Sequence, residues 1–267
     1  MTAPEERPLE TLPADWQAAL AGARVRHLPA GLCNHVYRVD SGPQSLALRL
    51  NNPAPGALGI DPAREGAILD GIADQPWAPR VRYRDRHCLL TDWVQGSPPA
   101  GGSGARLHWL AHALNSVHTC PGDWPALDIP DQLRRLISRC GRPESRTRAR
   151  IEPLLADLPA TDRRVLCHND WHPGNLVIGR GGWTLLDWEF AGLGDPRLDI
   201  GGAINGFALD ARQITSLSRL TGFPVKELTQ ASTIMKVMEI VWYAANPDLA
   251  PERAGDLADW LDGNLQL

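Results

Sequence analysis

Lysine is almost absent from this chain of 267 residues, which contains Lys226 and Lys236 against 25 arginines. Residues 1–225 contain no lysine at all. The codon bias of the source genome would account for this, but the chemical consequence is the same. A site in the first 225 residues that needs a cationic side chain must use arginine or histidine.

The chain also lacks an excess of basic charge. It has 27 Lys and Arg against 31 Asp and Glu, and a formal net charge of -4. Without a broad positive field we expect no nucleic acid and no membrane as partner. The longest apolar stretch, residues 231–245, is broken by Lys236 and Glu239 and is too short to span a bilayer. The oligomeric state, monomer or homodimer, stays open at this point.

A long apolar run is missing from the polar start of the chain, Met-Thr-Ala-Pro-Glu-Glu-Arg-Pro, which therefore lacks the apolar core of a secretory signal. Paired cysteine motifs are missing too, because the five cysteines are widely spaced and form no C-x-x-C. Such cysteines are typical of reduced thiols inside a cytoplasmic protein. We therefore expect a cytoplasmic location.

The pattern of apolar residues changes near residue 95. Before it, a short helix over 12–22 is followed by β-like runs separated by Gly and Pro, and by one helix after Asp61-Pro62. Residues 95–104 read as a Gly- and Pro-rich linker, after which apolar residues recur at helical spacing. We therefore predict an α+β fold with two lobes, a β-rich lobe over 1–94 and a larger helical lobe over 95–267.

The residues with the clearest chemistry lie between 166 and 202. Asp170 is followed by Asn175 and then, at the end of an apolar run, by Asp187. Asp170 is suited to orient a substrate hydroxyl or accept its proton, whereas the other two offer the hard oxygen ligands that Mg²⁺ prefers beside nucleotide phosphates. A hairpin over 176–186 would bring these two together. The arrangement is typical of phosphoryl transfer.

The segments C-H-N-D-W-H-P-G-N (167–175) and L-L-D-W-E-F-A-G (185–192) resemble the catalytic signature of the aminoglycoside phosphotransferase and choline kinase superfamily. The resemblance extends over roughly residues 30–205. It implies a small-molecule kinase with a bilobal protein-kinase-like fold. In that fold a small antiparallel-sheet lobe carries one main helix, and a larger helical lobe carries the catalytic loop.

The resemblance implies a role for each residue of the signature. Asp170 resembles the catalytic aspartate, and His168 is expected to support the catalytic loop by hydrogen bonding. Asn175 and Asp187 resemble the two metal ligands, so Mg²⁺ is the implied metal. His172 is expected near the substrate or the transferred phosphate.

The resemblance also implies a binding site for ATP. Gly31 and Asn34 lie in a segment that resembles the phosphate-covering hairpin. Arg49 occupies the strand position where protein kinases place a phosphate-binding lysine, and a guanidinium is able to bind two phosphate oxygens. Glu65 is the candidate ion-pair partner of Arg49. The hinge, whose backbone would hydrogen-bond adenine, is expected at Asp92, Trp93 and Val94.

The acceptor is implied to be a small molecule with a hydroxyl group. Arg49 resembles the choline and thiamine kinase branches more than the antibiotic kinases, and the C-terminal segment combines aromatic residues with six acidic ones between Glu239 and Asp262. Aromatic faces and carboxylates favour a cation, so choline, ethanolamine or thiamine types are expected. The expected acceptor-site residues are His172, Trp188, Glu189, Trp242, Tyr243 and Trp260.

Two other functions stay open from the sequence. One is an aminoglycoside or sugar phosphotransferase, and the other is a catalytically silent, nucleotide-binding pseudokinase. The intact set of Asp170, Asn175 and Asp187 argues against the pseudokinase. A run of seven arginines between Arg134 and Arg150 is interpreted as a solvated helix face, although an anionic partner is conceivable.

Overall fold

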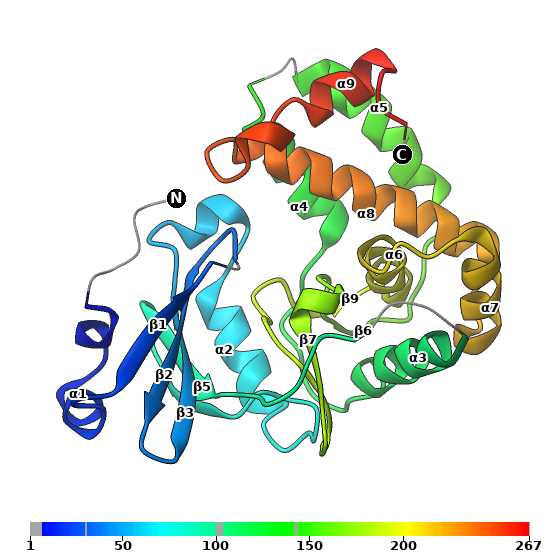
Figure 1. Cartoon of the computed structure of the whole chain (residues 1–267). Helices are drawn as coiled ribbons and strands as arrows, with labels where there is room; N and C mark the ends of the chain where they lie inside the picture. The colour runs from blue at the N-terminus through cyan, green and yellow to red at the C-terminus, as the bar shows by residue number, and fades with distance from the viewer. Residues whose placement is uncertain (1–6, 30, 100–103, 142–143, 267) are drawn as a thin grey trace.

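The chain folds into a small lobe built on an antiparallel sheet and a larger lobe built mainly of helices (Figure 1). A computed structural model describes residues 7–29, 31–99, 104–141 and 144–266. The predicted α+β class and two-lobed arrangement are confirmed. The exact boundary at residue 94 stays a prediction, and part of the expected linker, residues 100–103, lies outside the described residues.

The small lobe contains a five-stranded sheet in which neighbouring strands are antiparallel and follow the order β1-β2-β3-β5-β4. A short 3₁₀ turn and helix precede it. The elements are η1 (Pro8–Thr11), α1 (Ala14–Ala19), β1 (Arg24–Leu28), β2 (His35–Ser41), β3 (Gln44–Leu50), β4 (Val81–Arg84) and β5 (Cys88–Asp92).

Side chains alternate across this sheet, as the period of a strand requires. On one face Tyr37, Val39 and Leu48 pack with Leu12 and Leu20 from the N-terminal segment. The opposite face turns toward the large lobe and includes Val36, Ala47 and Arg49 of β2 and β3. The sheet thus has a core on one side and a binding surface on the other.

One main helix, α2 (Pro62–Gly71), lies beside the sheet on the side of the large lobe, after the 3₁₀ turn η2 (Pro55–Leu58) (Figure 1). Asp61 caps it, because its carboxylate accepts hydrogen bonds from the backbone N–H groups of Ala63 and Arg64. Glu65, in the first turn, is buried. The guanidinium of Arg64 donates to the carbonyl oxygens of Ala191 and Glu189 in the large lobe, at 2.9 and 3.3 Å. These bonds hold α2 against the catalytic half of the molecule.

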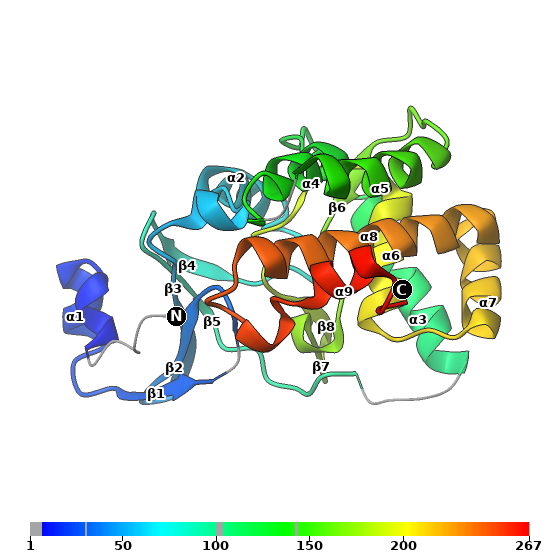
Figure 2. The ribbon, with the colours of Figure 1, turned by 90° about the horizontal axis from the view of Figure 1, so that it is seen from above.

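The large lobe contains the longer helices, of which α8 crosses the lobe and ends next to the small lobe (Figure 2). Its tightest neighbour is α6, where a side chain at Gly201 would lie 2.5 Å from the backbone of Ala231. The helices are α3 (Gly104–His118), α4 (Ile129–Ile137), α5 (Glu144–Asp157), α6 (Pro196–Gly206), α7 (Ala211–Thr221), α8 (Val225–Ala245) and α9 (Asp256–Asp262), with the 3₁₀ turn η4 (Pro251–Arg253) before α9.

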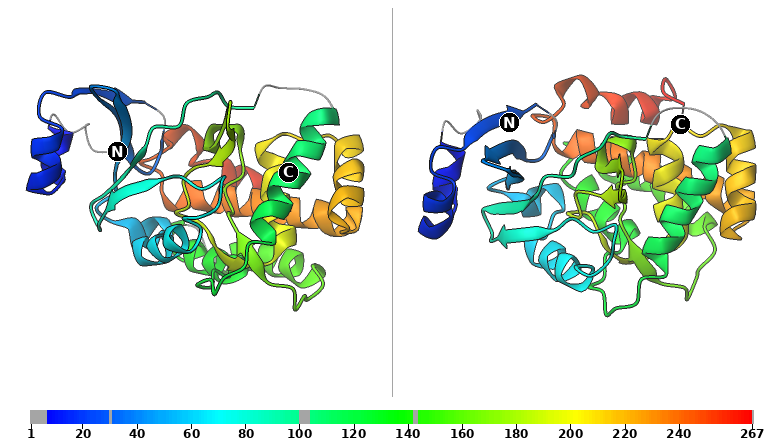
Figure 3. Two further views of the ribbon diagram at one scale, coloured as in Figure 1. Left: turned by 90° about the horizontal axis from the view of Figure 1, so that it is seen from below. Right: turned by 60° about the horizontal axis from the view of Figure 1, so that its bottom comes forward.

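Two short antiparallel pairs lie between the sheet of the small lobe and the helices of the large lobe (Figure 3). The predicted hairpin is present as β7 (Leu176–Gly179) and β8 (Gly182–Leu185), after the 3₁₀ turn η3 (Pro173–Asn175). β6 (Val165–Cys167) pairs with β9 (Gly192–Gly194), a strand that the sequence did not predict. These pairs flank the residues of the two motifs over 167–175 and 185–192.

Three of the described arginines of the 134–150 run pair with acidic residues of the same chain. Arg134 bonds Glu152 and Asp131, Arg148 bonds Glu144, and Arg146 bonds Asp262. Arg142 lies outside the described residues. These pairs offset the charge of these three arginines within the chain. Among the described helices, none is long and apolar enough to cross a membrane.

Candidate active site

A cavity of about 800 Å³ lies between the two lobes and contains most of the residues that the sequence singled out. The small lobe contributes strand residues and Glu65 of α2, and the large lobe contributes the catalytic segments and parts of α4, α6 and α8. Site residues expected from the sequence that line it are Gly31, Asn34, Arg49, Glu65, Asp170, His172, Asn175, Asp187, Trp188, Glu189, Trp242 and Tyr243.

Asp170 follows β6 and stands on a loop that Asn175 holds in shape. The amide nitrogen of Asn175 donates to the Asp170 carboxylate at 2.7 Å and to the Asp170 carbonyl oxygen at 3.0 Å. Nε2 of His172 lies 3.6 Å from the same carboxylate, and Nδ1 of His172 accepts from the N–H of Gly174. Burial acts to raise the pKa of Asp170, but His172, His168 and Asn175 outweigh it and lower that pKa below its ordinary value. Asp170 is therefore a carboxylate at neutral pH.

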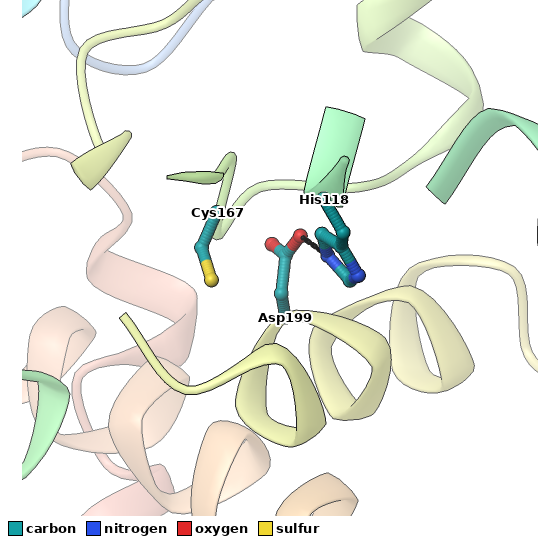
Figure 4. Close-up of side chains that lie close together, drawn as sticks. All are labelled: His118, Cys167 and Asp199. Atoms are coloured by element: carbon teal, nitrogen blue, oxygen red, sulfur yellow. Dashed lines mark hydrogen bonds and ion pairs between the residues drawn. The ribbon is translucent and has the colours of Figure 1, made fainter. Parts of the chain in front are cut away.

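A buried cluster beneath the loop fixes its backbone (Figure 4). Asn169 has a left-handed conformation with φ 63°, and its N–H donates to Asp199 of α6 at 2.6 Å. The other oxygen of Asp199 bonds Nε2 of His118 at 2.7 Å and the indole N–H of Trp171 at 2.9 Å. Burial acts to raise the pKa of Asp199, but these bonds keep it below its ordinary value. A side chain fully occupied in this way supports the catalytic loop.

Cys167 completes this cluster, and the ligand atoms of His118, Cys167 and Asp199 lie within 4.8 Å of one another. All three residues are buried. Both oxygens of Asp199 already accept hydrogen bonds from the catalytic loop and from His118. Both carboxylate oxygens of Asp199 are thus engaged in a structural hydrogen-bond network.

His168 joins the catalytic loop to the second motif. Its Nδ1 accepts the N–H of Asp170 at 3.3 Å, and its Nε2 bonds the carbonyl oxygen of Leu186 at 2.9 Å. These partners require the neutral ring with the proton on Nε2. Burial lowers the pKa of His168, in agreement with a neutral ring. In the structure both ring nitrogens of His168 thus bond the backbone of these two segments, and its role as a support of the catalytic loop stays a prediction.

Asn175 and Asp187 lie at the base of the β7–β8 hairpin. The carbonyl oxygen of Asn175 accepts the N–H of Leu186 at 2.7 Å, which brings the two segments side by side. Asp187 has φ 61°, a strained conformation for a residue with a side chain, and this conformation is often found at functional positions. The amide nitrogen of Asn175 is bonded to Asp170, which turns its amide oxygen away from that carboxylate. One amide oxygen and one carboxylate are a donor set that fits Mg²⁺.

Arg49 connects the two lobes through a group of carboxylates. Its guanidinium forms a two-bond pair with Glu65, at 2.8 and 2.5 Å, and donates to Asp187 at 2.9 Å. Glu189 lies 3.8 Å away. Burial raises the pKa of Asp187 to about 6 and, with the charge of Asp187, raises the pKa of Glu189 to about 8. The expected pair of Arg49 and Glu65 is present. Further positive charge nearby would stabilise the ionised forms of Asp187 and Glu189.

The segment expected over the phosphates folds onto Glu189. The amide nitrogen of Asn34 donates to Glu189 at 2.6 Å, and its oxygen accepts the N–H of Asn52 at 3.0 Å. Gly31 has φ 133°, and a side chain there would lie 3.1 Å from the carbonyl oxygen of Asn34. Glu189 therefore contacts the small lobe, whereas the sequence placed it with the acceptor.

An apolar slot of the cavity lies under the sheet. Its lining residues are Leu28, Val36, Ala47, Leu89 and Thr91. The expected hinge residues Asp92, Trp93 and Val94 follow Thr91 directly and are not among the described lining residues. The side chains of Asp92 and Trp93 turn elsewhere, since Asp92 pairs with Arg82 and the ring of Trp93 lies under Arg38. The assignment of this segment to adenine stays a prediction about its backbone.

The other end of the cavity is formed by α6 and α8. Trp242 and Tyr243 line it, and the indole N–H of Trp242 also donates to the carbonyl oxygen of Leu58 at 3.0 Å. Lys236 and Glu239 lie on the same wall and form an ion pair. The guanidinium of Arg253 covers the ring of Tyr243 at 4.3 Å. The sequence did not identify Lys236 as a site residue, because its direction depends on how α8 packs.

Two expected acceptor-site side chains are held in the core. The indole of Trp188 is buried against Trp77 and His168, and its N–H donates to the carbonyl oxygen of Leu185. Trp260 is buried and covered by Arg150, and it is not among the described lining residues of the cavity. Of the six acidic residues between 239 and 262, all of them described, Glu239 lines the cavity. The structure thus does not bring Trp260 to the acceptor end.

The sequence of the chain matches the model of the phosphotransferase enzyme family over residues 24–230. The chain belongs to this family. It is therefore a phosphotransferase with an alcohol group as acceptor, as its motifs predicted. A search of curated protein sequences finds no match.

Solved structures of low sequence identity share the fold. Choline kinase LicA from Streptococcus pneumoniae has a TM-score of 0.75 and 16% identity, with 93% of this chain and 97% of that chain covered. A choline/ethanolamine kinase family protein from Mesorhizobium loti has a TM-score of 0.72 and 17% identity, with 97% and 92% covered. Macrolide 2'-phosphotransferase type I has a TM-score of 0.65 and 18% identity, with 98% and 99% covered. The protein-kinase-like fold expected from the sequence is confirmed.

Proposed function

We propose that the protein transfers the γ-phosphate of ATP to a hydroxyl group of a small metabolite that carries an amine. The observation that carries this proposal is that Asp170, Asn175, Asp187 and Arg49 face one cavity between the lobes. Support also comes from the fold, which is shared with LicA in complex with AMP at a TM-score of 0.72. Mg²⁺ bound by Asn175 and Asp187 would neutralise charge on the phosphates.

The chain's own residues divide the work of the transfer. Asp170 orients the acceptor hydroxyl and takes its proton as the new O–P bond forms at the γ-phosphorus. The bond from the γ-phosphorus to the bridging oxygen breaks, and ADP leaves with that electron pair. Arg49 contributes positive charge to the phosphates, and His172 lies close enough to Asp170 to stabilise its negative charge.

The amine of the acceptor is proposed from the lining of the far end of the cavity. Trp242 and Tyr243 present aromatic surface there, and Glu239 and Asp170 supply negative charge. Both features favour an ammonium group. The choline, ethanolamine and thiamine types predicted from the sequence each carry a positively charged nitrogen. A cytoplasmic location, where ATP is at hand and the five cysteines would stay free, is proposed as well.

The proposal is tested by ADP release from the purified protein with ATP, Mg²⁺ and a panel of alcohols. We expect ADP to depend on both an amine-bearing alcohol and Mg²⁺, and to disappear with a chelator. A protein that binds ATP but releases no acceptor-dependent ADP with any alcohol would be a nucleotide-binding pseudokinase instead. A preference for aminoglycosides, macrolides or neutral sugars would assign it to antibiotic or sugar phosphorylation.

A further inference from the structure

The acceptor end of the cavity contains a cation beside its anion. Nζ of Lys236 lies 2.8 Å from Oε2 of Glu239, one helical turn along α8. Both side chains line the cavity and keep 38% and 33% of their surface exposed. The other oxygen of Glu239 bonds Arg253 at 3.0 Å. Glu239 is therefore already shared between two cations of the chain.

This pairing disfavours an acceptor that carries only positive charge. Such a ligand would have to compete with Lys236 and Arg253 for Glu239, and its charge would lie beside the ammonium of Lys236. One face of Tyr243, which the sequence assigned to a cation, is already covered by Arg253 at 4.3 Å. Like charges brought together in a binding site oppose binding.

An acceptor that carries only negative charge is disfavoured for the opposite reason. It would meet Lys236, but it would also face Glu239 and the carboxylate of Asp170 in the same cavity. A ligand that carries both an ammonium and a carboxylate avoids both repulsions, since its ammonium meets Glu239 and its carboxylate meets Lys236.

On the basis of the proposed function, we propose that the acceptor is a zwitterion, an alcohol that carries both an ammonium and a carboxylate group. Lys236 receives the carboxylate, and Glu239, together with the exposed part of Trp242, receives the ammonium. The ligand thereby replaces the internal ion pair with two intermolecular ones. Lys236 is then the residue that selects this substrate class.

Matched alcohols separate the three charge classes. Ethanolamine, serine and 3-hydroxypropanoate share one hydroxymethyl group and differ in whether they carry an amine, both groups, or a carboxylate. The set of 3-aminopropanol, homoserine and 4-hydroxybutanoate repeats the comparison with one more carbon. We expect the better zwitterion to have a kcat/KM about tenfold above that of its two partners, the size of one charge-assisted hydrogen bond.

The two lysines of the chain provide a variant and a matched control. Lys236→Met should raise the KM of the zwitterion about tenfold, leave the KM of ATP unchanged, and abolish the preference over the matched cation. Lys226→Met alters an exposed lysine at the start of the same helix and should change neither value. Circular dichroism and the melting temperature show that each variant is folded, and Lys236→Gln replaces Lys236→Met if the latter is not.

The outcomes are distinct. The zwitterion proposal is overturned if the cation or the anion has the highest kcat/KM in both sets. It is also overturned if Lys236→Met lowers kcat/KM equally for all three charge classes. Either result leaves the proposed kinase in place. Absence of phosphorylation of every alcohol, while Mg·ATP still binds, overturns the proposed function and the zwitterion with it.

Discussion

Nη1 of Arg49 lies 2.9 Å from Oδ1 of Asp187, so the cation of the small lobe directly contacts the carboxylate of the large lobe that we propose as a Mg²⁺ ligand. Arg49 is held in place by its two bonds to Glu65. The contact joins the two lobes across the cavity and leaves Asp187 in a group of four acids with Glu65, Glu189 and Asp170. Positive charge supplied by a metal ion would relieve this crowding.

Asp187 should supply more of the affinity for Mg·ATP than Asn175, because a carboxylate brings charge to the metal and an amide does not. We expect Asp187→Asn to weaken Mg·ATP binding more than Asn175→Ala does. Titration calorimetry with the two variants gives the order directly. The reverse order would mean that the roles of the two ligands have been exchanged.

Replacing Asp187 should also stabilise the protein without ligands. Burial raises the pKa of Asp187 to about 6 from its ordinary 3.8. A carboxyl with a raised pKa contributes stability that is fully present below pH 3.8 and is lost as the pH rises through 6. At pH 7.5 the free energy of unfolding of Asp187→Asn should exceed that of the parent by about 1 kcal/mol, after a discount for the exposed part of the side chain and the lost bond to Arg49.

This gain should shrink steadily as the pH is lowered from about 7.5 toward 4, because the parent carboxyl then becomes protonated in the folded state. Urea denaturation of both proteins over this range measures it. A difference that is independent of pH would show that Asp187 is not under electrostatic strain.

Arg49 should matter for both stability and nucleotide binding. Arg49→Ala leaves Glu65 buried without its partner, which costs about 3 kcal/mol or more, and it should raise the KM of ATP. The double variant Arg49→Met, Glu65→Gln removes both charges and should recover most of the stability but none of the ATP affinity. Thermal melting and steady-state kinetics separate the two effects. Recovery of ATP affinity in the double variant would exclude contact between Arg49 and the phosphates.

The bond between His118 and Asp199 should control turnover without touching the substrate. His118→Leu leaves Asp199 short of a donor and should loosen the loop of Asn169 and Asp170, with a fall in kcat of about tenfold or more and little change in the KM of ATP. His118→Gln retains a donor and should recover part of kcat. If kcat is equal in the two variants, the network is a packing feature without influence on Asp170.

Much of the catalytic site could be predicted because its residues lie close together in the sequence. Asp170, Asn175 and Asp187 are separated by one turn and one hairpin, so local pattern alone brings them together. Arg49 and Glu65 lie on neighbouring elements of the small lobe, and their pairing was expected from the resemblance to the kinase superfamily. The α+β fold followed from the change in apolar period near residue 95.

The remaining features depend on contacts between distant parts of the chain. β9 has three residues, Gly192–Gly194, and exists as a strand because β6 lies beside it. His118 reaches Asp199 from a helix 81 residues earlier. Lys236 faces the cavity and Trp260 faces the core. These directions depend on how α8 and α9 pack, and the apolar period of the sequence does not reveal them. Which side chains line the acceptor end of the cavity is therefore the part of this site that the sequence predicts least well.

The proposed phosphoryl transfer is tested most directly by ³¹P NMR of the protein with Mg·ATP and its best acceptor, beside the Asp170→Asn variant. This variant keeps the shape of the side chain, and its amide oxygen is able to accept the hydrogen bond from Asn175 in place of the carboxylate. We therefore expect it to fold and to bind Mg·ATP. In the parent, a phosphomonoester of the acceptor should appear at the rate at which the γ-phosphate signal disappears, and the variant should be slower by at least about 10²-fold. Equal rates in the two proteins, or loss of the γ-phosphate only to inorganic phosphate, would contradict the assignment of Asp170 and of the transfer itself.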